Sequence, residues 1–335
     1  MAVNSNDDAR FKVVEYSPEK AEMIGYSNYS YWKSVLHNFL KKKSAVALLI
    51  VFVALVVFSF VALVIGKYDY RNLVTDSSKG FILPNSEFWF GTDNLGRDYW
   101  SQVWYATQTS IKLACIVAIG ECVLGVTIGL LWGYVRQLDR FFTELYNVID
   151  NIPQIIYMTL IALMVGKSFT IMAVSLIAFG WLGMARNIRN LVMMYRDREY
   201  NLASRCLGTP TYRILLKNIL PYLISVIILR VALSIPRTIS METTLSYLGL
   251  GLDINTPTLG ILLRNARSYF LNYPYLLVFP AVIVSVVTIT FYLVGNAFPM
   301  RLIREITFKG GEQWKRNQYY PPKTLKLRLA FAETN

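Results

Sequence analysis

The feature that most constrains this sequence is an apolar run at residues 44–66, where 23 consecutive positions carry no charged side chain. About 20 such residues in a helix cross the hydrocarbon core of a bilayer. The run is too long for the core of a signal peptide, and no small-residue cleavage site follows it closely. We therefore predict a retained transmembrane helix, which excludes an ordinary water-soluble fold.

Five further apolar runs predict five more spans, near residues 111–135, 148–166, 170–185, 222–245 and 276–298. Only residues 167–169 separate the third and fourth spans, so we expect a tight helical hairpin there. The composition agrees, because 54% of the residues are hydrophobic and 16% are charged, whereas soluble domains have about 25% charged residues. The predicted fold is an all-α polytopic membrane protein with six transmembrane helices, and residues 44–298 form this domain.

The positions of the basic residues predict the orientation. If the N-terminus is inside, 24 Lys and Arg lie in inside segments and seven in outside segments. Lys and Arg favour the cytoplasmic side of a membrane. We therefore expect both termini in the cytoplasm, and the net charge of +13 needs no nucleic acid to explain it. The inside segments in this count are 1–43, 136–147, 186–221 and 299–335.

The segment before the first span predicts a helix on the membrane surface. Its apolar residues recur at helical spacing on one face, and three lysines follow before the first span. Such a helix lies on the inner leaflet with its lysines near anionic headgroups. The alternative is a plain cytoplasmic extension of the first span. The apolar residues are Trp32, Val35, Leu36, Phe39 and Leu40, and the lysines are Lys41, Lys42 and Lys43.

Several kinds of chemistry are excluded by what the sequence lacks. One histidine, His37, and three cysteines leave no His/Cys metal site, no disulfide framework and no histidine-based catalytic triad. The tripeptide at 166–168 resembles the end of a phosphate-binding loop, but Ile161 stands where that loop requires a glycine. We therefore expect no catalytic residue, no metal and no cofactor on this chain, and no ATP bound by it.

The long inside segment at 186–221 predicts a compact pair of helices. Residues 198–207 suit a helix, and Gly208 suits its C-terminal cap. Thr209 and Pro210 suit the N-cap and first position of a second helix, and Pro221 predicts a break before the next span. Such a unit projecting from the inner face can transmit force from a docked partner.

Four motifs carry a resemblance to a known family. Glu199-Tyr200-x-x-Ala203-Ser204-x-x-x-Gly208, followed by Leu220-Pro221, resembles the EAA loop of ABC importer permeases. Residues 90–98 resemble the Gly-Thr-Asp-x-Leu-Gly-Arg-Asp stretch of the oligopeptide/dipeptide branch, and residues 242–251 resemble its Glu-x-x-Leu-Ser-Phe-Leu-Gly-Leu-Gly. Residues 257–260 are similar to its Pro-Ser-Trp-Gly. The resemblance runs from about residue 30 to 298 and is closest to the C-type subunit of oligopeptide importers.

Three positions depart from the family pattern. Leu202 stands where the EAA motif has its glutamate, Ser204 follows the retained Ala203, and Leu259 replaces the tryptophan of the last motif. The family assignment stands, but the individual contacts of the loop are not carried over by the resemblance.

The resemblance implies a multi-subunit importer. A second, homologous permease subunit completes the pore, two ABC ATPase subunits with ATP and Mg bind beneath, and an extracellular or periplasmic binding protein delivers a peptide. The residues implied in ATPase coupling are Arg198, Glu199, Ala203, Ser204, Gly208, Arg213, Leu220 and Pro221. The alternatives are a dipeptide or nickel importer, an ion-coupled secondary transporter and a membrane-embedded enzyme. The sequence shows no internal inverted repeats to support the secondary transporter and no clustered acids to support the enzyme.

Two other groups of residues are candidates for function. The outer segment is expected to form a turn that feeds a helix and to shape the outer mouth and the binding-protein interface through Gly91, Asp93, Gly96, Arg97 and Asp98. Charged side chains inside a span are costly, so they face the bundle interior, water or a partner charge. Those of the fifth span either line the pore or form a structural ion pair: Arg230, Arg237 and Glu242.

Two further features concern packing and the C-terminus. Gly125, Gly129 and Gly133 form two overlapping Gly-x-x-x-Gly steps that allow close helix contact, within the subunit or with the partner permease. Residues 299–335 form a basic tail that departs from the family pattern, and a shifted reading frame can restore part of that pattern. We hypothesise that a frameshift produced this tail and that it has no function, which the coding DNA decides.

Overall fold

The computed structural model describes residues 43–70, 80–253 and 256–297. The predicted surface helix before residue 41 and the tail at 299–335 lie outside these residues. Within them the structure is helical, and the sole extended pairing is one bridge between Thr92 and Asp98. The elements are α3 (Lys43–Ile65), α4 (Tyr99–Tyr134), α5 (Arg136–Asp150), α6 (Gln154–Met164), α7 (Phe169–Arg196), α8 (Glu199–Cys206), α9 (Thr211–Arg213), the π-helix η2 (Ile214–Ile219), α10 (Leu220–Tyr247), α11 (Leu259–Arg267) and α12 (Tyr275–Ala297).

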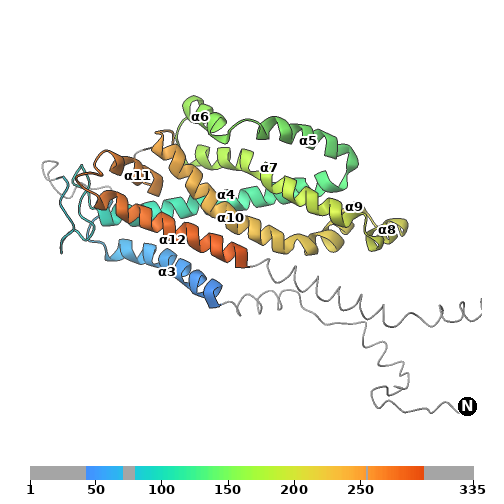
Figure 1. Cartoon of the computed structure of the whole chain (residues 1–335), viewed down its shortest axis with the longest axis horizontal. Coiled ribbons are helices and arrows are strands. Elements are labelled where there is room, and N and C mark those ends of the chain that lie inside the picture. Colours follow the sequence, from blue (N-terminus) through green and yellow to red (C-terminus); the bar gives the residue numbers. More distant parts are fainter. Residues whose placement is uncertain (1–42, 71–79, 254–255, 298–335) are drawn as a thin grey trace, which may run out of the picture.

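The long helices form a layered bundle (Figure 1). Helices α3 and α12 lie together on one side, α4 and α10 occupy the middle, and α7 packs on α4 at the other side. Buried apolar residues fill the space between α3, α4, α10, α11 and α12, among them Ala62, Val103, Ile239 and Val287. The short helices α8 and α9 project from one end of the bundle, and α11 lies at the opposite end.

The glycine row on α4 is packed within this subunit, which decides between the two predicted alternatives. A Cβ atom at Gly125 would come within 2.5 Å of the Met184 Cβ, and one at Gly133 within 2.7 Å of the Arg189 carbonyl oxygen. Real Cβ contacts are longer, so only glycine allows the backbones of α4 and α7 to approach this closely.

Four of the described helices are long and apolar enough to cross a membrane, namely α4, α7, α12 and the continuous helix Thr211–Tyr247. The α5–α6 pair would make a fifth span, and α3 contributes a shorter apolar stretch at Leu49–Ile65. The chain is therefore a multi-pass membrane protein, and the count of six spans stays a prediction.

The third predicted span, at 148–166, is wrong as a single straight helix. Helices α5 and α6 meet at 79° across residues 151–153. Pro153 explains this bend, because proline lacks the amide N–H of a helix interior and disfavours helical geometry at the preceding residue. Helix α5 instead lies against α4 and α7, where Arg189 Nε donates to Asp139 Oδ1 at 2.6 Å and Trp132 packs near Tyr146.

The second and fourth predicted spans are too short. Helix α4 begins at Tyr99 rather than residue 111, and α7 continues to Arg196 rather than ending at residue 185. The α4 extension contains polar side chains that the protein itself buries, such as Gln102 and Thr107, and the α7 extension contains charged residues beside the buried Ile188 and Val192. A search for apolar runs misses them because it detects only the part of a helix that suits lipid.

The predicted break at Pro221 is also wrong. The chain is helical from Thr211 to Tyr247 and contains the wider π turn of η2 just before the proline. A π turn accommodates a residue that cannot donate its N–H, so the helix continues past Pro221. The second helix of the pair begins at Thr211 with Pro210 as N-cap, one residue later than predicted.

Candidate functional site

The first candidate site is the α8 end of the bundle. Helix α8 covers Glu199–Cys206, and the chain then reverses at Gly208, whose φ of +74° suits glycine. Arg198 is the N-cap residue but makes no side-chain cap hydrogen bond. Eight helical residues alone are too few to be stable in water, so contacts with the bundle must hold α8 in place.

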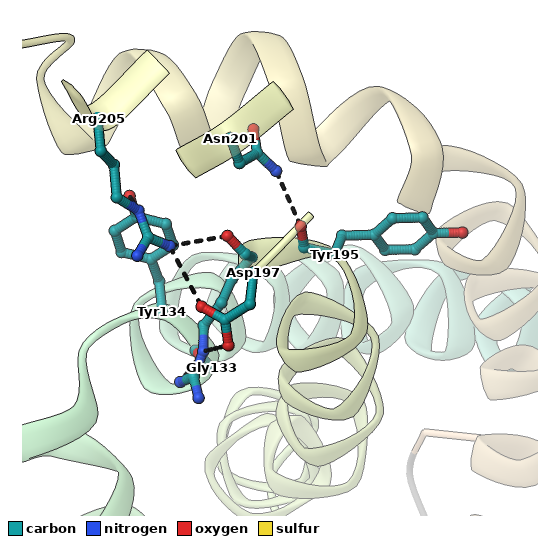
Figure 2. A network of polar contacts seen from close by, with 7 residues as sticks. Gly133, Tyr134, Tyr195, Asp197, Asn201 and Arg205 are labelled. Atoms are coloured by element: carbon teal, nitrogen blue, oxygen red, sulfur yellow. Dashed lines mark hydrogen bonds and ion pairs between the residues drawn. The ribbon is translucent and has the colours of Figure 1, made fainter. Parts of the chain in front are cut away.

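Arg205 connects α8 to the ends of α4 and α7 (Figure 2). Its terminal nitrogen donates to the Arg196 carbonyl oxygen at 2.8 Å and lies 3.7 Å from Asp197 Oδ1. Its Nε donates to the Tyr134 hydroxyl at 3.2 Å, and its guanidinium lies over the ring of the same tyrosine. One side chain therefore joins three helices.

Asp197, labelled in Figure 2, and its neighbour Arg196 extend the same network. Arg196 donates to the Gly133 carbonyl oxygen at 3.0 Å, which satisfies one of the free carbonyls at the end of α4. Its Nε also donates to Asp197 Oδ2 at 3.1 Å. The exits of α4 and α7 are thus tied together where α8 begins.

Asn201 forms the second connection. Its side chain is fully buried and donates to the Tyr195 carbonyl oxygen at 2.9 Å. It accepts from Asn218 of η2 at 3.1 Å, and Asn218 also donates to Ser204 Oγ at 3.3 Å. Helix α8 is therefore bound to the end of α7 and, through η2, to the start of α10.

The surface of this end carries apolar groups with charges around them. Leu207 is 85% exposed, and Tyr212 is also exposed. Tyr200 is also exposed, its ring lies near that of Tyr222, and partial burial raises the pKa of its phenol. This surface has the character of a contact face.

The residues predicted for coupling divide into two groups at this end. Arg198, Glu199, Ala203, Gly208, Arg213 and Pro221 are exposed, whereas Ser204 and Leu220 are partly buried. The network that holds α8 includes Ser204 but consists chiefly of residues that were not predicted, namely Asn201, Arg205 and Asn218. The signal for them was present in the sequence, since asparagine is a poor residue for a helix interior unless its amide is engaged.

The outer segment at the opposite end is tightly built around Asp93. Its carboxylate accepts from the backbone N–H groups of Leu95 and Arg97, from Arg97 Nε at 2.8 Å and from Gln102 Nε2 at 2.9 Å. Gly91 and Gly96 have φ of +75° and +74°. These contacts form a closed turn, as the sequence predicts.

The same turn is attached to two helices. Asp98 caps α4 by accepting from the Ser101 N–H at 2.9 Å, as predicted for a helix start. Tyr275 of α12 donates to the Thr92 carbonyl oxygen at 2.7 Å, and Tyr99 donates to the Leu276 carbonyl oxygen. The outer turn is therefore a rigid part of the bundle rather than a loose connection.

The third region is the middle of the bundle, where the predicted pore residues lie in two different places. Arg230 donates to Asn187 Oδ1 at 2.7 Å, and Arg237 donates to Gln154 Oε1 at 3.3 Å. Both arginines line a cavity of about 130 Å³ between α4, α7 and α10. Among the described residues, no ion pair joins Arg237 to Glu242, so the predicted structural pair is not formed.

Glu242 does not line this cavity. It is 1% exposed and accepts from the Ser246 hydroxyl at 2.7 Å and the Thr258 hydroxyl at 2.6 Å, at the junction of α10 and α11. The acid in the cavity is instead Glu121 of α4, which was not among the predicted site residues. Within the described residues, no three His, Cys, Asp or Glu side chains lie close enough to share a metal ion.

Comparison with known proteins agrees with this architecture. Residues 125–304 match the family described as the binding-protein-dependent transport system inner membrane component, and residues 30–82 match the N-terminal TM domain of oligopeptide transport permease C. The chain is 38% identical over 292 residues to the oligopeptide transport system permease protein AmiD of Streptococcus pneumoniae, which covers 87% of this chain and 95% of that protein.

Two further relatives show the same relationship. The oligopeptide permease OppC of Bacillus subtilis is 29% identical over 82% of this chain and 90% of its own length. The dipeptide permease DppC of Lactococcus lactis is 32% identical over 66% of this chain and 65% of its own length. On the family match and on the near full-length similarity to AmiD, the chain belongs to the membrane-component family of binding-protein-dependent transport systems.

Proposed function

We propose that this chain is one of two homologous permease subunits of an ATP-driven ABC importer for oligopeptides. It forms half of the translocation pore, and it is not itself an enzyme. ATP and Mg are bound by two partner ATPases, and a binding protein delivers the peptide on the outer side. The similarity to AmiD and OppC over most of the chain supports oligopeptides as the substrate class.

The observation that carries this proposal is the attachment of α8 to three long helices. Through Arg205, Asn201 and Asn218, α8 is bound to the exits of α4 and α7 and to the start of α10. A push on α8 is then passed to these helices together, because packed and hydrogen-bonded elements move as units. ATP drives transport if the ATPases bind one arrangement of these helices better than the other.

The ATPase contact is assigned to the exposed side of α8 and α9. Leu207 and Tyr212 supply an apolar centre, and Arg198, Glu199 and Arg213 supply a charged rim. The remaining coupling residues shape the segment: Ala203 and Ser204 within α8, Gly208 at the turn, and Leu220 and Pro221 at the entry to α10.

One matched pair of variants tests this contact. Leu207→Asp introduces a charge at a side chain that is 85% exposed, and Leu271→Asp does the same at a side chain that is 89% exposed at the opposite end. Co-purification of the ATPases with the permease pair is measured for both. We expect Leu207→Asp to lose the ATPases and Leu271→Asp to keep them. Equal recovery in both variants would exclude α8 as the docking element.

The native cysteines test the orientation. Cys206 is exposed at the α8 end, whereas Cys115 and Cys122 are partly buried in α4. With both termini in the cytoplasm, a membrane-impermeant maleimide labels Cys206 in inside-out vesicles of the bacterial plasma membrane from which the ATPases have been stripped, and leaves it unlabelled in intact cells. The reverse pattern would place α8 outside. In this orientation the outer turn formed by Gly91, Asp93, Gly96, Arg97 and Asp98 supports the binding protein.

The substrate is tested with the complete complex in proteoliposomes. We expect ATP-dependent uptake of a labelled oligopeptide that requires the ATPases and the binding protein. Dipeptide and Ni²⁺ uptake are measured in parallel, because a dipeptide permease is also among the relatives. Uptake by the purified chain alone, without ATP, would instead identify an ion-coupled secondary transporter.

A further inference from the structure

The central cavity lies at mid-length of three helices. Its polar wall contains Glu121 from α4, Asn187 from α7, and Arg230, Ser234 and Arg237 from α10. Positions 230, 234 and 237 are four and three residues apart, so they share one face of α10. A polar cavity at this depth in an otherwise apolar bundle is costly, which marks it as a functional site.

Glu121 is fixed in this cavity by residues from the other two helices. Its Oε2 atom accepts from the Ser234 hydroxyl at 2.5 Å. A Cβ atom at Gly180 of α7 would lie only 1.7 Å from Glu121 Oε1, so the carboxylate occupies space that only a glycine leaves free. Glu121 is only 8% exposed, and residues of α4, α7 and α10 together fix the position of its carboxylate.

The two arginines are held more weakly than the glutamate. Each donates to a neutral amide oxygen, Arg230 to Asn187 and Arg237 to Gln154, and among the described residues neither forms an ion pair. Both are exposed on the surface of this chain. Guanidinium groups midway along a helix that is long and apolar enough to cross a membrane do not face lipid without a large cost, so they face a water-filled path or an ionic ligand.

The charges of the cavity favour an anionic ligand. Two guanidinium groups face one carboxylate, and that carboxylate is already engaged by Ser234. A guanidinium binds a carboxylate through two parallel N–H donors, a stronger interaction than its hydrogen bond to an amide oxygen. An entering carboxylate therefore replaces Asn187 and Gln154 as the partner of Arg230 and Arg237.

We propose that this cavity is a transient binding site for a carboxylate of the peptide as it crosses the membrane, held by Arg230 and Arg237. The inference rests on the proposed function, because it assumes that a peptide passes along this face. Glu121 and Ser234 form the opposite wall and limit how tightly an anion is held. The cavity accommodates a terminal group or a side-chain carboxylate, not a whole peptide.

The test uses the complete complex in proteoliposomes and three peptides of one sequence. One has a free C-terminal carboxylate, the second has a C-terminal amide, and the third has the amide together with one internal glutamate. Binding of each peptide to the binding protein is measured separately and used to normalise uptake. The variants are Arg230→Gln with Arg237→Gln, and the matched control is Arg136→Gln, an exposed arginine at the start of α5 outside the cavity.

With the wild-type complex we expect normalised uptake of the free acid to exceed that of the amide about tenfold, since a charge-assisted contact is lost in the amide. In the double variant the preference for the free acid over the amide is lost, whereas the control keeps the wild-type ratio. If the glutamate peptide is taken up as well as the free acid, the site binds any carboxylate. If it is taken up only as well as the amide, the site binds the C-terminal carboxylate alone.

Two results would overturn the inference. Either the double variant keeps the wild-type preference, or it lowers uptake of all three peptides equally while the complex remains assembled on size-exclusion chromatography. If the wild-type complex transports none of the peptides, the proposed function fails rather than this site.

Discussion

Replacing Gly129 by alanine tests the close packing of α4 against α7. A Cβ atom at this position would lie 2.7 Å from the Ala185 carbonyl oxygen, 2.8 Å from the Ile188 Cβ and 3.0 Å from the Ala185 Cα. Ordinary contact for a Cβ begins at 3.4 Å, and two of the three contacting atoms belong to the backbone. The two helices must therefore move apart, because no flexible side chain can yield.

The magnitude follows from two opposing effects. Overpacking of a tight interface costs about 1–3 kcal/mol. Alanine is a better helix former than glycine by up to about 1 kcal/mol. The packing cost is larger, so Gly129→Ala is expected to destabilise the protein. Gly183→Ala on α7 separates the two effects, because a Cβ there meets its nearest atom only at 3.9 Å.

The assay is thermal unfolding of the purified complex in detergent, with both variants measured under one set of conditions. Gly183→Ala is expected to match or exceed the wild type, and Gly129→Ala is expected to fall below it. Since the helix-propensity gain is common to both, the difference between the variants reports the packing cost, about 1–3 kcal/mol. Equal stability of the two variants would refute the interpretation that the glycine row sets the distance between α4 and α7.

Three further predictions concern other parts of the bundle. Asn201→Ala removes a buried amide that holds α8 and is expected to cost about 1–3 kcal/mol locally; hydrogen exchange of α8 measures it, and unchanged exchange would contradict it. Asp98→Ala removes the acceptor for the Ser101 N–H and is expected to cost about 0.5–2 kcal/mol; the thermal midpoint of the complex reports the loss, and Asp98→Asn should restore most of it. Gly180→Ala collides with the Glu121 carboxylate at 1.7 Å and is expected to reduce recovery of folded complex; adding Glu121→Ala should restore recovery, and independent effects of the two changes would show that they are not in contact.

Local signals predict much of this structure. The apolar run at 44–66 corresponds to α3, Gly208 ends α8, and Asp98 begins α4. Each of these features depends on a few neighbouring residues, so the sequence contains what is needed. The sequence does not predict the lengths of α4 and α7. The α4 extension carries polar side chains that are buried inside the protein, and the α7 extension carries charged side chains, whereas a window of hydropathy measures only suitability for lipid.

The central cavity shows why the pore residues were harder to predict. Glu121 and Glu242 are similar in sequence, since each is an acid within an apolar run. Their environments differ because of residues far along the chain: Glu121 lies beside Gly180 and faces Ser234, whereas Glu242 is enclosed at the α11 junction. Helical spacing relates residues within one helix and gives no information about which residues of a neighbouring helix they contact. Only the assembled bundle therefore distinguishes the carboxylate that belongs to the cavity from the one that closes a junction.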